Sequence, residues 1–221
     1  YIDVYFSKAK PEEITSVHTK MRADIYLATP GQEAAAVQYY TDAVNTDTVL
    51  LNKIDMGKKV AAIFKSKKMY DKQIIFERMV LAMKPNPTLT DYFNATIAYY
   101  FATKYDSSRG LALKMQELYP NEIYGFEWAF NNSKIMDTVK KDSIAVPDAT
   151  KLLGFAEKDT VKYKRQYSAT AGFLLGYYAN DAKDGVKALE YLKKMLLMDP
   201  TNQNLLDIQK QLEKSNKQSG N

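Results

Sequence analysis

The chain has 221 residues, 46% hydrophobic and 26% charged, which is typical of a globular protein with a sizeable core. It has no cysteine and one histidine, which excludes disulfides, thiolate catalysis and the common zinc sites. Its net charge of +5 includes no run of five like charges, and no apolar run reaches 18 residues, so we expect neither a polybasic arm nor a transmembrane segment.

The chain begins with residues 1–10, which hold three aromatic side chains and no helix start signal before them. We interpret them as the tail of a preceding helix, which favours a chain cut from a longer protein. Residues 11–48 then predict a first pair of helices, separated by the turn at Pro30-Gly31. Thr15 or Ser16 is placed to cap the first helix of that pair.

Two further helix pairs are predicted over 50–85 and 87–120, and each ends at a proline. The pairs share a frame, in which a position that favours a small residue is followed twelve residues later by a terminator. These positions are Ala36 with Thr48, Gln73 with Pro85, Ser108 with Pro120 and, further along the chain, Ala188 with Pro200. Gln73 departs from the frame because its side chain is large.

The segment 121–168 is less regular. Residues 122–137, which include Trp128, predict one helix, residues 138–147 predict a loop, and residues 148–157 predict a short helix. We therefore expect a degenerate helix pair with an inserted loop. Trp128 suits either a binding hot spot or the core, and its helical spacing favours the core.

Residues 169–202 contain the clearest helix pair. Gly176 and Ala188 have almost no side chain, which predicts a close approach of two helix backbones at both positions. Leu192 lies four residues after Ala188, on the same helix face, and is expected to fill the space above it. Pro200 ends the unit.

The last segment, 203–221, has one apolar stripe on an otherwise polar helix, which suits a C-terminal capping helix followed by a polar tail. No segment of the chain alternates convincingly with period two. We therefore predict an all-α fold of about eleven helices.

This spacing resembles the tetratricopeptide repeat, a 34-residue helix pair with a Leu-Gly dipeptide, a small Ala, a bulky residue and a terminal Pro. In this chain those positions are Leu175-Gly176, Ala188, Leu192 and Pro200. The resemblance covers about 11–214, with three repeats over 11–120 and a fourth over 169–202. It implies a right-handed α-α superhelix, a tetratricopeptide-like solenoid.

The resemblance also implies a function, namely a non-catalytic scaffold that binds a protein or peptide on the concave face of the solenoid. The arrangement over 120–200 resembles bacterial envelope-associated arrays, which favours a periplasmic or envelope location and leaves the cytoplasm open. The alternative is a structural array that self-associates or links an envelope assembly through its ends. A homo-oligomer therefore stays possible.

The concave face of such an array comes from the first helix of each pair. The resemblance places ten candidate binding residues on it: Arg22, Ile25, Lys58, Lys65, Phe93, Asn94, Ile97, Tyr100, Phe173 and Tyr177. This aromatic and mildly basic surface suits an apolar or acidic peptide. One branch of the family clamps a C-terminal carboxylate, but its ligand residues are replaced here, so that binding mode is not carried over.

Catalytic and metal chemistry finds little support in the sequence. His18 lies near the start of a predicted helix, where we assign it a capping or surface role rather than that of a general base. The chain has neither a calcium-loop spacing nor a phosphate-binding glycine loop. The lysine cluster over 65–72 is typical of a solvated turn. We expect no enzyme activity, catalytic residue, metal, cofactor or nucleic-acid partner.

Overall fold

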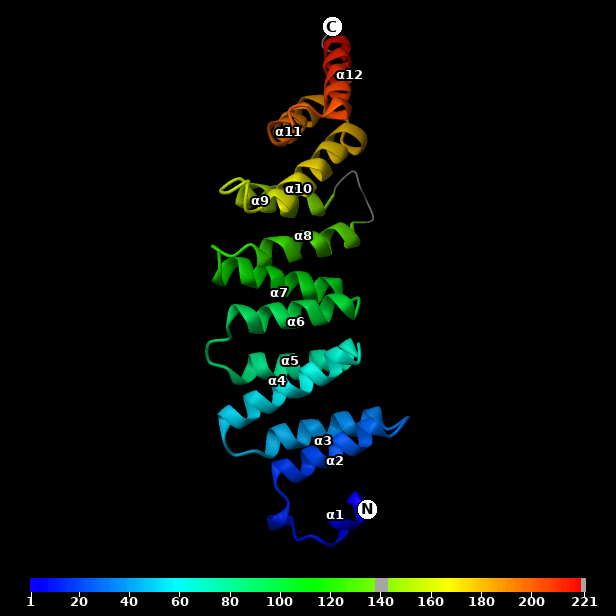
Figure 1. Ribbon diagram of the computed structural model, residues 1–221, viewed down its shortest axis with the longest axis vertical. Coiled ribbons are helices and arrows are strands. Elements are labelled where there is room, and N and C mark those ends of the chain that lie inside the picture. Colours follow the sequence, from blue (N-terminus) through cyan, green and yellow to red (C-terminus); the bar gives the residue numbers. More distant parts are fainter. Residues whose placement is uncertain (138–142, 220–221) are drawn as a thin grey trace. The chain divides into compact units, whose positions relative to one another are not determined.

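The computed structural model describes residues 1–137 and 143–219, which contain twelve α-helices and no strand (Figure 1). The all-helical, solenoid-like fold predicted from the sequence is confirmed, with twelve helices in place of about eleven. The chain divides into two compact units, Tyr1–Lys104 and Tyr105–Asn221. Each unit is described by itself.

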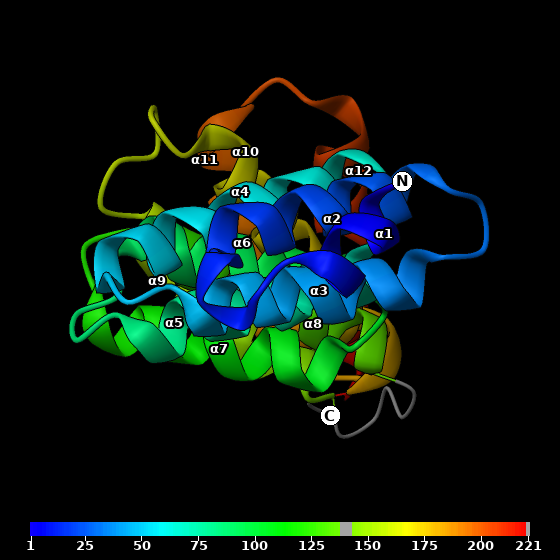
Figure 2. The same cartoon turned by 90° about the horizontal axis from the view of Figure 1, so that it is seen from below.

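The first unit is a stack of helices joined by short connections. It contains α1 (Ile2–Lys8), a 3-10 turn (Pro11–Glu13), α2 (Ser16–Ala28), α3 (Glu33–Thr46), α4 (Leu50–Ser66), α5 (Tyr70–Met83) and α6 (Leu89–Phe101). Helix α2 packs on α3 and α4 packs on α5, while α3 contacts α4 and α5 contacts α6. Figure 2 shows α2 and α4 on one side of this unit and α3 and α5 on the other.

The core of the first unit is built around three buried aromatic rings. Phe64 and Phe76 stack with ring centroids 5.6 Å apart, and Tyr40 meets each of them edge-on. The Tyr40 hydroxyl donates to Asp24 Oδ1 at 2.6 Å, and burial, followed by this hydrogen bond, raises the pKa of the phenol. Each pair of aromatic rings in such contact adds about 0.5–1.5 kcal/mol to the stability, beyond the contribution of the surface that it buries.

Asp91 ties α6 to its neighbours. Its side chain is 3% exposed, accepts from the Thr88 backbone at 2.8 Å, and pairs with Lys58 at 3.1 Å and with Lys84. Burial alone would raise the pKa of the Asp91 carboxyl, but the hydrogen bonds from Lys84, Thr88 and Lys58 hold it well below its usual value. Lys58 lies on α4, Lys84 directly follows α5 and Thr88 directly precedes α6. One carboxylate therefore joins all three helices.

A second buried polar group fills the irregular position of the repeat frame. Gln73 and Glu77, one helical turn apart on α5, are 1% and 6% exposed. Gln73 Nε2 donates to Glu77 Oε1 at 3.0 Å, and Gln73 Oε1 has no partner among the described residues. Burial raises the pKa of the Glu77 carboxyl, only partly offset by Gln73. The departure at Gln73 thus places an amide–carboxyl pair inside the stack.

The first prediction concerns Glu77→Gln. Because the pKa of Glu77 is raised on folding, the folded state loses stability as pH rises through that pKa. An uncharged Gln does not titrate, so it does not cause this loss of stability. The variant should therefore unfold at a higher temperature than the wild type at about pH 8 and at a similar temperature at about pH 4. Calorimetric melts at both pH values test this. Glu12→Gln, at an exposed position, is the control; an equal shift there would contradict the explanation.

The second unit is also built from consecutive helices. It contains α7 (Tyr105–Leu118), α8 (Tyr124–Met136), α9 (Ala145–Ala156), α10 (Lys164–Gly176), a π-helical turn (Tyr177–Asp181), α11 (Gly185–Met198) and α12 (Gln203–Ser219). Each of these helices packs on the next one in the chain. The prediction of a loop over 138–147 lies partly outside the described residues. It is wrong from Ala145 onward, where the Ser143 hydroxyl accepts from the Ala145 backbone and α9 begins.

The core of the second unit centres on Phe155. Its ring lies 4.9 Å from that of Phe126 and 5.4 Å from that of Tyr163, and the buried Leu174 of α10 belongs to the same cluster. Trp128 on α8 is half-buried, so the expected core position holds in part. The cluster joins α8, α9 and α10.

Gly176 and Ala188 have different roles in the structure. Ala188 and Leu192 are fully buried and pack with Leu175, which confirms the expected role of this pair. The close approach predicted at Gly176 is wrong, because a Cβ added there would meet no heavy atom within 4 Å. Leu175 packs on Ala188 and Leu192 of α11, whereas the Cβ position of Gly176 faces open space.

A close helix approach in the second unit occurs at Gly125 instead. A Cβ added there would lie 2.7 Å from the Gln116 nitrogen and 2.9 Å from the Ala112 oxygen, both backbone atoms of α7. Backbone atoms cannot rotate away as a side chain can. The crossing of α7 and α8 therefore requires glycine at this position.

Gly125→Ala is the second prediction. Alanine favours a helix over glycine by about 1 kcal/mol, but the clash with α7 should outweigh this and destabilise the protein by roughly 1–3 kcal/mol or more. Urea unfolding measures the difference. Gly154→Ala on α9 is the matched control, because a Cβ there meets nothing within 4 Å; it should be neutral or stabilising. Equal effects at both glycines would contradict the close approach.

No helix in the described ranges has both the length and the apolar character needed to cross a membrane.

Candidate functional site

The ten candidate binding residues belong to both units. The first unit holds eight of them on α2, α4 and α6: Arg22, Ile25, Lys58, Lys65, Phe93, Asn94, Ile97 and Tyr100. The second unit holds Phe173 on α10 and Tyr177 in the π-helical turn. Each group is described within its own unit.

Helix α2 has an exposed apolar stripe. Val17, Met21 and Ile25 are four residues apart, so they share one helix face, and their exposed fractions are 59%, 52% and 47%. Val17 also borders a groove of about 210 Å³ whose lining includes Met56 and Lys59 of α4. An apolar surface beside a groove is suited to contact with another protein.

Arg22 is engaged within the unit. Its guanidinium lies 4.7 Å from the centroid of the Phe6 ring and 4.2 Å from that of Tyr39. It also donates to Asp3 Oδ1 from Nε at 3.0 Å and from Nη2 at 2.7 Å. A hydrogen bond from Tyr26, followed by those from Arg22, lowers the pKa of the Asp3 carboxyl. Arg22 thus fastens α1 to α2, a use that spacing along one helix does not reveal.

The remaining candidates in the first unit have varied surroundings. Lys58 is half exposed and pairs with Asp91. Lys65 lies about two helical turns further along α4, is exposed and has no ion pair in the described part of the chain. Four candidates on α6 are half-buried: Phe93, Asn94, Ile97 and Tyr100. The accessible groups are therefore mainly the α2 stripe and the α4 lysines.

A third prediction follows from the Arg22 contacts. Arg22→Ala removes both the stacked guanidinium and the ion pair with Asp3, so the Tyr26 hydroxyl alone would still bond Asp3 and the attachment of α1 to α2 should weaken. Backbone amides of Ile2–Lys8 should then exchange with deuterium faster, which mass spectrometry of the labelled protein measures. Lys20→Ala on the same helix is the control, since the ion pair that Lys20 makes among the described residues is with Asp24 of its own helix. Unchanged exchange in α1 would rule out this anchoring role.

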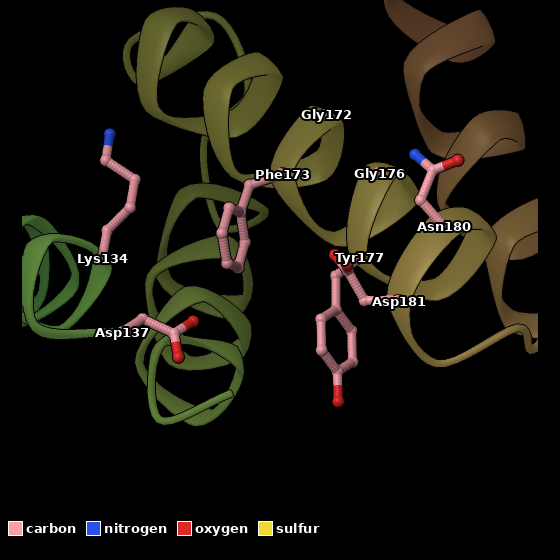
Figure 3. Close-up of a pocket in the computed structure, with 8 residues that line it drawn as sticks. All are labelled: Lys134, Asp137, Gly172, Phe173, Gly176, Tyr177, Asn180 and Asp181. Atoms are coloured by element: carbon pink, nitrogen blue, oxygen red, sulfur yellow. The ribbon is translucent and has the colours of Figure 1, made fainter. Parts of the chain in front are cut away.

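In the second unit, Phe173 and Tyr177 lie together in one pocket of about 320 Å³, which we call the α10 pocket (Figure 3). Its lining consists of Lys134, Asp137, Gly172, Phe173, Gly176, Tyr177, Asn180 and Asp181. Lys134 and Asp137 come from the end of α8, and the other residues come from α10 and the turn that follows it.

The π-helical turn shapes this pocket. The Ala182 backbone N–H donates to the Tyr177 carbonyl at 3.0 Å, five residues back, so the turn contains one residue more than an α-helical turn. The turn follows the end of α10 at Gly176, and two of its residues, Tyr177 and Asp181, line the pocket together with Phe173. Turns of this kind occur frequently at functional sites. The sequence pattern gave no indication of the turn.

The charges around the pocket are unequal. Lys134 lies 5.3 Å from the centroid of the Phe130 ring, and that ring meets Phe173 edge-on at 5.1 Å. Asp137 accepts a hydrogen bond from Ser143. Asp181 is exposed and has no ion pair among the described residues. Among the described lining residues, two carboxylates thus face one ammonium group, so the charge of this part of the lining is opposite in sign to that of the chain.

The described residues include His18, the single histidine of the chain. The Thr15 backbone N–H donates to His18 Nδ1 at 3.2 Å, so the predicted capping role of this histidine is confirmed. No group of three or more His, Asp or Glu side chains is placed to hold a metal ion in the part of the chain that the structure describes.

Comparison with known proteins supports the fold. The chain matches no protein-family model and no curated protein sequence. The structure is similar to the C-terminal part of a TPR repeat-containing protein from Cytophaga hutchinsonii, with 28% identity over 93% of this chain and 78% of that one, and a TM-score of 0.62. YrrB, a TPR protein with an unusual peptide-binding site, shows 14% identity over 88% and 92%, with a TM-score of 0.49.

The stacked helix pairs and the first of these comparisons define the class of protein. The chain is an all-helical repeat array whose fold is similar to that of a TPR repeat-containing protein.

Proposed function

We propose that the protein is a non-catalytic scaffold that binds a protein or peptide on the face formed by the first helices of its repeats. The observation that supports this best is the stripe of Val17, Met21 and Ile25 on α2. Each of these side chains is about half exposed, so covering it would stabilise a complex by about 1 kcal/mol. Three such side chains on one helix face form a continuous apolar surface that a segment of a partner protein could cover.

Charge narrows the choice of partner for this face. Lys58 and Lys65 lie on α4, the first helix of the next pair, and Lys65 is free of ion pairs among the described residues. A segment with apolar residues and acidic neighbours would meet both the stripe and these lysines. The resemblance of 120–200 to envelope-associated arrays supports a periplasmic or envelope setting in bacteria as part of this proposal.

The fourth prediction tests this face directly. Met21→Glu with Ile25→Glu places two charges in the stripe without touching a buried residue. Immobilised wild-type protein should retain a partner from extracts of the native host, and the double variant should retain at most about a tenth as much, since the lost contacts correspond to roughly tenfold in affinity or more. Quantitative mass spectrometry of the retained proteins measures the ratio.

Two controls separate this proposal from its alternatives. Val161→Glu changes a residue that is 87% exposed in the second unit and should retain the partner as the wild type does. Light scattering of the free protein shows whether it self-associates. Equal retention by the stripe variant and the wild type would contradict the proposal, and retention of the chain itself alone would favour the self-associating array.

A further inference from the structure

The α10 pocket combines features that suit a cation. Two aromatic rings, Phe173 and Tyr177, and two carboxylates, Asp137 and Asp181, line it. The faces of aromatic rings attract cations, and carboxylates pair with them. We propose that the α10 pocket binds the guanidinium group of an arginine side chain from a partner segment.

The same chain already holds a guanidinium in this way. In the first unit, Arg22 lies over the rings of Phe6 and Tyr39 and donates two hydrogen bonds to the Asp3 carboxylate. The α10 pocket offers the same three kinds of group, namely a phenyl ring, a phenol ring and a carboxylate. In this pocket the described residues supply no arginine to fill the position between them.

The size of the pocket fits one side chain. Its volume of about 320 Å³ is at the lower end of the range for ligand sites, roughly 300–1,000 Å³. Part of the space exists because Gly176 has no Cβ, and nothing else lies within 4 Å of the place where one would be. The pocket therefore suits the end of a side chain better than a large ligand.

Charge favours arginine over an anion or a lysine. The ammonium of Lys134 lies against Phe130, so an anion entering the pocket would face two carboxylates and one cation among the described lining residues. Asp137 accepts from Ser143 through Oδ2, and its Oδ1 has no donor among the described residues. A planar guanidinium can stack on a ring and donate to carboxylates at once, whereas an ammonium group offers only a compact charge.

This inference rests on the proposed function, because it names the chemistry of one contact within the proposed scaffold. The two can fail separately. Loss of partner retention in the α2 stripe variant depends on the first unit, and arginine binding depends on the second. A protein that retains its partner but binds no arginine would contradict this inference alone.

The experiment is a titration of the full ¹⁵N-labelled chain with N-acetyl-arginine methylamide, followed by amide chemical shifts. Saturable shifts should appear at Lys134, Asp137 and in 172–181. The uncharged isostere N-acetyl-citrulline methylamide should cause no saturable shift, and the lysine analogue should bind several-fold more weakly. Shifts confined to other parts of the chain, or equal binding of the citrulline analogue, would overturn the proposal.

Variants locate the site. Gly176→Leu should fill the pocket and abolish the shifts, whereas Gly154→Leu, another helical glycine with open space around its Cβ position, should leave them unchanged. Asp181→Asn changes an exposed side chain and should weaken binding about fivefold. Because it removes only a surface charge, it keeps the test decisive if Gly176→Leu does not fold. Unchanged binding in Asp181→Asn and in folded Gly176→Leu would refute the site.

Discussion

Helices can stack in this chain only where residues with little or no side chain face a neighbouring helix. Ala23, Ala36 and Ala43 are fully buried in the first unit, and Ala112 and Ala188 are fully buried in the second. Gly125 is the extreme case, because α7 backbone atoms occupy the space that a Cβ would need. Larger side chains such as Tyr40, Phe64 and Phe155 then fill the gaps that these approaches leave.

Two buried carboxyl groups show how polar residues are accommodated in such a stack. Asp91 has two lysines and the Thr88 backbone around it, so its charge is stabilised and joins three helices. Glu77 is hydrogen-bonded to the amide of Gln73 and has no ion pair among the described residues, so burial prevails and its charge is disfavoured. The difference lies in the partners rather than in the depth, because both side chains are nearly inaccessible to solvent.

The spacing of apolar, small and terminator residues was enough to predict the helices, because burial in a stack imposes that spacing directly. The spacing also indicated Gln73 as irregular. The resemblance to the repeat gave Phe173 and Tyr177 as candidate site residues, and the structure brings these two into one pocket. It could not predict that Arg22 pairs with Asp3, because that contact joins residues 19 apart on different helices. Nor could it show that Gly176 faces open space, since spacing gives a residue its face but not the neighbour opposite it.

The π-helical turn after α10 connects the length of the chain to the chemistry of the pocket. The turn holds one residue beyond the α-helical number, and each residue rotates a helix by about 100°. A single-codon deletion within 177–181 would restore α-helical winding and leave Asp181 seven residues after Phe173, which is about two helical turns and therefore the same helix face. During evolution, relatives of this array can therefore gain or lose the extra residue through one in-frame insertion or deletion, while Asp181 keeps its side of the helix.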